Sequence, residues 1–159
     1  MKTTEKYGKK ADFALSLWVK LIRSYDTMAM LTAKDIARYG LTPPQFSMFE
    51  SLGHLGPMLV KEIGAKKLMS GGNMTVVIDN LQKQGLVERA ACPTDRRATY
   101  IRLTEKGQKL FDDAFVQHAK YVEELVWSAL NEGEINQLAI LLKKLGLSLK
   151  EKLQILEEH

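Results

Sequence analysis

The sequence has a single cysteine, so no disulfide can form within the chain. It has no apolar run of the roughly 18 residues that a membrane-spanning helix needs. The N-terminus also lacks the basic start, apolar run and small-residue cleavage site of a secretory signal. We therefore expect a cytoplasmic protein with no membrane partner.

Catalytic and metal-binding patterns are missing as well. The three histidines, His54, His118 and His159, have no neighbouring cysteine or carboxylate pair at metal-ligand spacing. The chain contains no G-x-S-x-G, P-loop or G-x-G-x-x-G motif, so the corresponding nucleophiles and nucleotide-binding loops are absent. We expect no metal site, no cofactor and no enzymatic activity.

Positive charge, by contrast, is concentrated in one segment. Residues 60–107 hold nine Lys or Arg and five Asp or Glu, so the whole net charge of +4 lies there. Such a segment is typical of a surface that meets nucleic-acid phosphates. With 159 residues, of which 45% are hydrophobic, the chain fits one soluble domain with its own core.

Within that segment, the spacing of apolar residues predicts a helix. Four residues share one face at i, i+3, i+4 and i+7: Met74, Val77, Ile78 and Leu81. The opposite face begins with small and amide-bearing residues, where a solvated helix usually carries Lys and Glu. Asn73 could pair with adenine, Thr75 could donate or accept, and Val76 could meet a thymine methyl. The alternative is a polar first turn that contacts nothing.

A strand-like hairpin follows this helix. Gly85 is the expected C-terminal cap, and residues 86–90 and 99–103 alternate as strands do, with Pro93–Asp95 as a turn between them. The tip carries Arg96 and Arg97, whose guanidinium groups could enter a narrow minor groove. Helix and hairpin together predict a winged helix-turn-helix.

Helical periodicity continues on both sides of this unit. We expect further helices over residues 11–31, 42–52, 60–67, 104–130 and 135–149. Thr42 and Thr104 are the expected N-caps, and Gly53–Pro57 and Asn131–Glu134 the expected breaks. Met58–Leu59 could form a short strand that pairs with the wing.

We expect a single domain over residues 1–159, mainly α with a small β-hairpin wing (α+β). Its winged helix-turn-helix lobe spans residues 41–103, and its helical dimerisation region spans residues 11–40 and 104–159. The first and the last two helices carry more apolar surface than one chain can bury. A second copy is the simplest partner, because a dimer places two recognition helices one DNA turn apart.

A known family carries the same wing pattern. Asp95 and Arg97, followed by Leu103, Thr104 and Gly107, resemble the D-x-R-x5-L-T-x-x-G signature of the MarR family of transcriptional regulators. The resemblance implies a homodimeric winged-helix repressor on a pseudo-palindromic operator in double-stranded DNA, released by a small ligand or by oxidation. Many members have an arginine or another long polar residue where this chain has Val76.

The expected DNA contacts fall on the recognition helix, the turn before it and the wing. They are Lys66, Lys67, Ser70, Gly71, Gly72, Asn73, Thr75, Val76, Asp95, Arg96 and Arg97. The lysines and Ser70 would meet phosphates, which position a protein without specifying sequence. Asp79 could hold a wing arginine, or it could simply be exposed.

Two features could sense a signal. A small aromatic ligand could bind where three helices meet, in a cleft lined by Trp18, Tyr25, Phe46, Phe49, His118 and Tyr121, although aromatic residues at helical spacing are more often plain core. Cys92 is the candidate for oxidation, because three nearby arginines could lower its pKa; otherwise it is a passive strand residue. The run 91–97 is similar to a MarR subgroup that responds to quinones and catechols.

Two other functions are alternatives to DNA binding. A winged helix can serve as a protein-interaction module without specific DNA binding, but the local charge of +4 and the Asn/Thr/Val face argue against that role here. An enzyme acting on small aromatics would need a reactive group, and no motif in the sequence supplies one.

Overall fold

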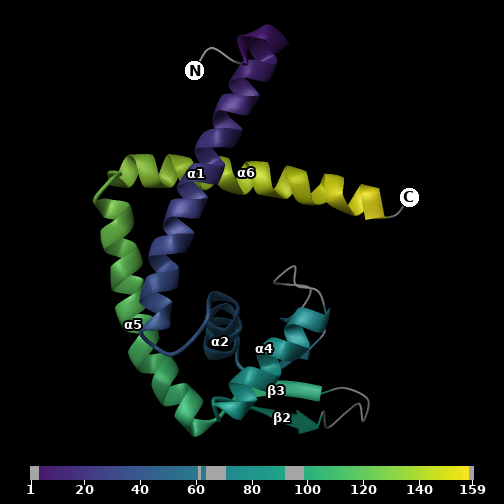
Figure 1. Ribbon diagram of the computed structural model, residues 1–159, viewed down its shortest axis with the longest axis vertical. Coiled ribbons are helices and arrows are strands. Elements are labelled where there is room, and N and C mark those ends of the chain that lie inside the picture. The colour runs from purple at the N-terminus through teal and green to yellow at the C-terminus, as the bar shows by residue number, and fades with distance from the viewer. Residues whose placement is uncertain (1–3, 61, 64–70, 92–98, 158–159) are drawn as a thin grey trace. The chain divides into compact units, whose positions relative to one another are not determined.

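The computed structural model describes residues 4–60, 62–63, 71–91 and 99–157 (Figure 1). It divides into two compact units, Met1–His118 and Ala119–His159. The first unit contains η1 (Glu5–Tyr7), α1 (Lys9–Ala37), α2 (Pro43–Leu55), β1 (Met58–Leu59), α4 (Gly71–Lys83), β2 (Val87–Ala91), β3 (Thr99–Leu103) and the first part of α5 (Glu105–Trp127). The second unit contains the rest of α5 and α6 (Glu132–Glu157). Among the described residues, no helix is long and apolar enough to cross a membrane.

The described strands form a small antiparallel sheet in the order β1-β3-β2. Val87 lies opposite Leu103 and Arg89 opposite Ile101 in the hairpin, while Met58 pairs with Ile101 on the other side of β3. The mainly helical class, the wing and the short strand at Met58–Leu59 are confirmed.

The end of α4 has the geometry of a Schellman motif. Gly85 adopts a φ of 70°, which favours glycine. The Leu86 N–H donates to the Leu81 carbonyl at 3.0 Å, and the Gly85 N–H donates to the Gln82 carbonyl at 2.9 Å. Leu81 and Leu86 are both buried. The predicted glycine stop is confirmed, and it delivers the chain directly into β2.

The core of the first unit lies between α2, α4 and the sheet, and the end of α1 contributes to it. Its members are the buried apolar residues Ile36, Leu41, Phe46, Met48, Phe49, Leu52, Met58, Ile63, Met74, Val77, Ile78, Leu81, Leu86, Val87, Ile101 and Phe111. This core fixes α4 through one face only, the face predicted from its spacing.

The predicted C-terminal ends of two helices in the first unit were wrong. Helix α1 runs on to Ala37, because Ile36 in its last turn joins the core. Helix α2 continues through Gly53 to Leu55 and ends at Gly56, which has a φ of 77°. Gly53 is needed within the helix, because a Cβ there would collide with the Phe111 ring. The Thr42 cap is confirmed as a capping box with Gln45.

In the second unit, Asn131 caps α6, which begins at Glu132, so the predicted break over Asn131–Glu134 is wrong after its first residue. The Asn131 side chain accepts a hydrogen bond from the Glu134 N–H at 3.1 Å, and the Glu134 carboxylate accepts one from the Asn131 N–H at 2.9 Å. This reciprocal cap offsets the cost of Gly133 in the first turn. Helix α5 ends at Trp127, three residues before the predicted end.

The close approach of α5 to Leu86 generates a prediction. A Cβ at Gly107 would collide with the Leu86 carbonyl oxygen, so Gly107→Ala should lower the free energy of unfolding by about 1–3 kcal/mol. Gly146→Ala is the matched control, because nothing lies within 4 Å of its added Cβ, and it should raise stability by about 0.5–1 kcal/mol. Urea unfolding measures both; equal effects would contradict the packing at Gly107.

Candidate nucleic-acid interface

Helix α4 presents two chemically different faces. Met74, Val77, Ile78 and Leu81 are buried, whereas Val76 is 58% exposed although it is as apolar as its neighbour Val77, which is 8% exposed. Asn73 and Thr75 are exposed as well. The face expected to read bases therefore points away from the core.

Sequence reasoning missed one member of this face. Asn80 is exposed and lies seven residues after Asn73, so the three residues Asn73, Val76 and Asn80 follow one another along the helix at i, i+3 and i+7. Among the described residues, neither asparagine side chain makes a hydrogen bond. The prediction stopped after the first two turns of the helix, although extending the same periodicity by one turn would have included Asn80.

An ion pair holds the other flank of α4 to the wing. Arg89 of β2 donates from Nη2 to Asp79 Oδ1 at 2.6 Å, and its Nη1 bonds the Gln82 side chain. The interpretation of Asp79 as the acid that holds a wing arginine is confirmed. Both charged side chains are more than a third exposed, so the pair contributes orientation more than stability.

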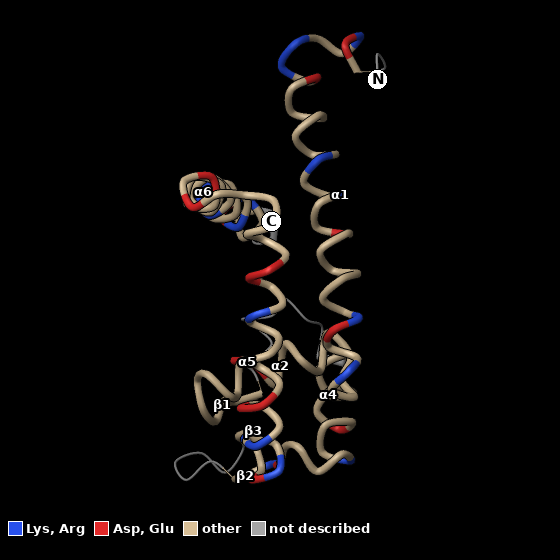
Figure 2. The backbone as a smooth tube through the Cα atoms, turned by 90° about the vertical axis from the view of Figure 1, so that its left-hand side faces the viewer, with Lys and Arg blue, Asp and Glu red and all other residues tan. Residues whose placement is uncertain are grey.

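The strands of the wing are linked in the same way. Arg102 of β3 donates to Glu88 of β2 at 2.7 Å, across the register that pairs these residues. In Figure 2, Lys and Arg are blue and Asp and Glu are red along the backbone, the strands of the wing included. Both wing arginines in the described strands are therefore engaged with acids of the same lobe.

The start of α5 is hydrogen-bonded to the turn that follows α4. Three consecutive carbonyls accept bonds from it: Gln84 from the Lys106 ammonium at 2.7 Å, Gly85 from the Thr104 hydroxyl at 2.7 Å, and Leu86 from the Thr104 N–H at 3.0 Å. The Thr104 hydroxyl also accepts from the Gly107 N–H at 3.0 Å, which confirms it as the helix cap. The L-T-x-x-G motif thus fixes the end of the recognition helix.

Several predicted DNA contacts lie outside the described residues: Lys66, Lys67, Ser70, Asp95, Arg96 and Arg97, as does Cys92. Gly71 and Gly72 form the beginning of α4. Of the predicted base-contacting residues, the structure therefore places Asn73, Thr75 and Val76 together on the exposed face of one helix.

The predicted ligand-lining residues lie in different environments. Phe46 and Phe49 are core residues, while Trp18 and Tyr25 are exposed on α1. The structure brings together Phe46 and His118, whose ring centroids are 4.6 Å apart. Tyr121 belongs to the second unit. Among the described residues, no group of three or more His, Cys, Asp or Glu could hold a metal ion.

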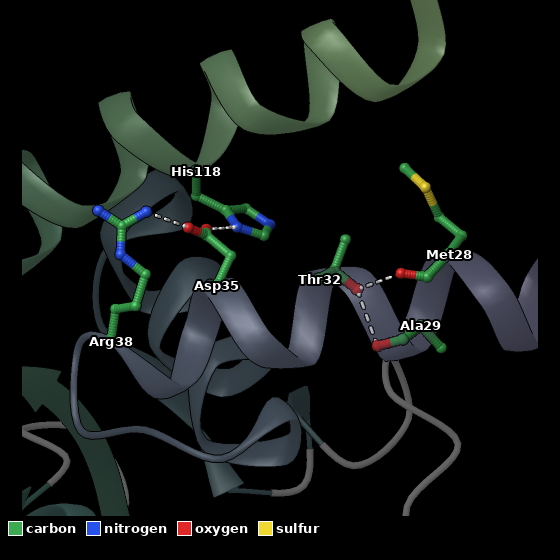
Figure 3. A network of polar contacts seen from close by, with 6 residues as sticks. All are labelled: Met28, Ala29, Thr32, Asp35, Arg38 and His118. Carbon is green, nitrogen blue, oxygen red and sulfur yellow. Dashed lines mark hydrogen bonds and ion pairs between the residues drawn. The ribbon is translucent and has the colours of Figure 1, made fainter. Parts of the chain in front are cut away.

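A buried carboxylate accounts for the position of His118 (Figure 3). Asp35 on α1 is buried, and its Oδ2 lies 2.8 Å from His118 Nδ1 on α5 while its Oδ1 lies 3.0 Å from Arg38 Nη1. Because a carboxylate only accepts, Nδ1 carries the hydrogen of that bond. Sequence reasoning missed Asp35, because a single acid in a helical pattern carries no sign of a partner 83 residues away.

Tyr39 lies beside this pair. Its hydroxyl is buried and has no hydrogen-bond partner among the described residues. Burial raises the pKa of the Tyr39 phenol above 10.0, the Asp35 carboxylate raises it further, and Arg38 acts in the opposite direction. The neutral phenol is therefore favoured in the folded protein.

The wing, the buried face of α4 and its exposed polar face define a winged-helix protein of the helix-turn-helix type. Residues 39–98 match the model of the MarR family. The chain is 38% identical to the HTH-type transcriptional regulator MhqR of Bacillus subtilis over 138 residues, which cover 87% of this chain and 94% of that relative. The chain belongs to the MarR family of transcriptional regulators, as its wing motif predicted.

Solved structures have the same fold. AbsC, a MarR family transcriptional regulator from Streptomyces coelicolor, superposes with a TM-score of 0.81 at 20% identity, covering 88% of this chain and 96% of AbsC. A mutant MarR from E. coli complexed with operator DNA superposes with a TM-score of 0.75 at 19% identity, covering 91% of this chain and 99% of that one.

The environment of Tyr39 generates a prediction. Tyr39→Phe should raise the free energy of unfolding by about 1 kcal/mol at neutral pH, because it removes a buried hydroxyl without a partner. In the parent protein, stability should fall as the pH rises above 10.0, because the unfolded phenol loses its proton there while the folded one keeps it up to its higher pKa.

Urea unfolding at about pH 8 and about pH 11 measures both effects. The part of the stability loss at high pH that comes from the Tyr39 phenol should be absent in Tyr39→Phe. Tyr25→Phe is the control, because Tyr25 is exposed on α1, and it should change stability by less than about 0.5 kcal/mol. A Tyr39→Phe variant less stable than the parent at neutral pH would contradict the assignment.

Proposed function

We propose that this chain is a homodimeric repressor that binds a pseudo-palindromic operator in duplex DNA and is released by a small aromatic or phenolic ligand or by oxidation. The observation that carries the DNA-binding part is the exposed face of α4, with Asn73, Thr75 and Val76, on a helix held firmly by its opposite face. Such a helix fits the major groove, where its N-terminal residues meet base edges.

The charge distribution supports the same function. The whole net charge of +4 belongs to residues 60–107. In our proposal Lys66, Lys67 and Ser70 contact phosphates, and Arg96 or Arg97 enters the minor groove. A mutant MarR from E. coli that shares this fold is complexed with operator DNA, which supports binding of this chain to duplex DNA.

Exposed apolar surface supports a homodimer. Among the residues of α6 whose exposure the structure describes, nine large apolar ones are exposed: Leu138, Ile140, Leu141, Leu142, Leu145, Leu147, Leu149, Leu153 and Ile155. A monomer rarely leaves so much apolar surface in water. A second copy is the partner that also supplies a second recognition helix for the other operator half.

Release by a signal is supported by the sequence of the wing and by exposed aromatic residues of α1. The run 91–97 resembles the quinone- and catechol-responsive subgroup, and it contains Cys92. The rings of Trp18 and Tyr25 are exposed on α1, and part of the His118 side chain is accessible to solvent. A ligand there would lower DNA affinity only if it binds better to a dimer that does not fit the operator.

DNA binding is tested by titrating the protein on a fragment of its own upstream DNA at two salt concentrations with excess nonspecific competitor. Binding should resist competitor and weaken steeply with salt, with a slope near −0.9 per neutralised phosphate. Asn73→Ala should lose on the order of tenfold or more in affinity, because one base pair is no longer recognised.

Asn136→Ala on α6 is the matched control, since Asn136 is also an exposed helical asparagine, and it should bind as the parent does. Adding catechols, quinones or oxidants to the preformed complex tests release. If no promoter fragment binds in the presence of competitor, the protein-interaction role replaces DNA binding.

The homodimer is tested by sedimentation. The parent should sediment at twice the chain mass of 18.0 kDa, and Leu149→Glu should shift the equilibrium towards monomer, because it places a charge in the apolar stripe of α6. Ser148→Glu, one residue away at a polar exposed position, should remain dimeric. A monomeric parent at micromolar concentration would contradict the proposal.

A further inference from the structure

The exposed face of α4 has two flanks, one that contacts the wing and one that faces solvent. Asp79 and Gln82 lie on the flank that holds Arg89 of β2. The other flank carries Asn73, Val76 and Asn80, successive turns of one helical stripe, and all three are exposed. This Asn-Val-Asn stripe remains available to a ligand that approaches α4.

The stripe has no arginine or lysine, the side chains that most often contact guanine. Bidentate contact from Arg or Lys to guanine O6 and N7 is the commonest specific contact in the major groove. Helix α4 carries a single cation, Lys83, at its last residue, whereas base contacts fall on the N-terminal part of a recognition helix. From Asn73 to Asn80, the exposed side chains therefore offer amides, a hydroxyl and an alkyl group, while the carboxylate of Asp79 is paired with Arg89.

Each of the groups on the stripe suits an A·T pair. An asparagine amide can donate to adenine N7 and accept from adenine N6, and an apolar side chain can contact the 5-methyl group of thymine. From this stripe we infer that α4 reads A·T pairs in each operator half-site and that Val76 determines specificity by contacting a thymine methyl. The inference rests on the proposed function, which it refines from DNA binding to a class of sequence.

The contact between Val76 and the thymine methyl distinguishes thymine from other pyrimidines because it buries apolar surface. Cytosine and uracil lack the 5-methyl group, so neither can replace the apolar contact with Val76. Burying one methyl-sized group is worth about a fourfold change in affinity, and a homodimer makes the contact twice. Because Val76 is exposed in the unbound lobe, the contact requires no rearrangement of the core.

The experiment replaces single thymines by deoxyuridine. Binding sites are first selected from a random duplex pool with the full chain, and each thymine of the selected site is then changed to deoxyuridine, which removes only the methyl group. For the parent protein, one thymine per half-site should show a loss of about fourfold, and the symmetric double replacement a loss of about 16-fold. Val76→Ala should abolish this dependence.

Val116→Ala is the matched control. Val116 is a valine on α5, a different helix, and it is 56% exposed, against 58% for Val76. That variant should keep the deoxyuridine effect of the parent. Helical circular dichroism of both variants verifies that any change in binding is not a loss of folding.

The outcomes separate the two proposals. If a site is selected but its thymines can all be replaced without loss, or if Val76→Ala keeps the same dependence, DNA binding stands and the Val76 assignment is overturned. Selected half-sites made of G·C pairs would overturn it as well. If no sequence is enriched above the starting pool, the proposed function itself fails, and this inference fails with it.

Discussion

The internal arrangement of the winged-helix lobe depends on hydrogen bonds to three consecutive carbonyl groups. Gln84, Gly85 and Leu86 leave the end of α4 and all accept hydrogen bonds from the Thr104–Lys106 segment that begins α5. Backbone carbonyl groups in a turn need hydrogen-bond donors, and here the donors come from the segment that begins the next helix. Because the same turn ends α4 and begins β2, one joint positions the recognition helix, the wing and α5.

The joint also explains why two motifs distant in sequence occur together. Gly85 supplies the positive φ that the turn needs, and Gly107 supplies the space that the Leu86 carbonyl needs. Their role is geometric, and the Asp79–Arg89 pair adds to it by setting the wing against the flank of α4.

Periodicity and turn chemistry were enough to predict most of the lobe. The buried face of α4, the glycine stop, the wing strands and the Thr104 cap all depend on residues within a few positions of one another. The Asp35–His118 contact joins residues 83 positions apart, so no local sequence pattern predicts it. The wrong breaks at Gly53 and Asn131–Glu134 arise for a related reason: Phe111 requires the first glycine, and a capping box turns the second segment into a helix start.

The composition of α4 is itself an argument for function. Its first turns contain Gly71, Gly72, Asn73, Thr75 and Val76, all weaker helix formers than Ala or Lys. An exposed valine gains nothing from burial in the core, and its branched side chain loses rotamer freedom in a helix. The buried face and the Schellman end therefore stabilise a helix that its exposed residues disfavour. Where local preference and global fold disagree in this way, the residues concerned usually serve a function, and in α4 they form the face directed away from the core.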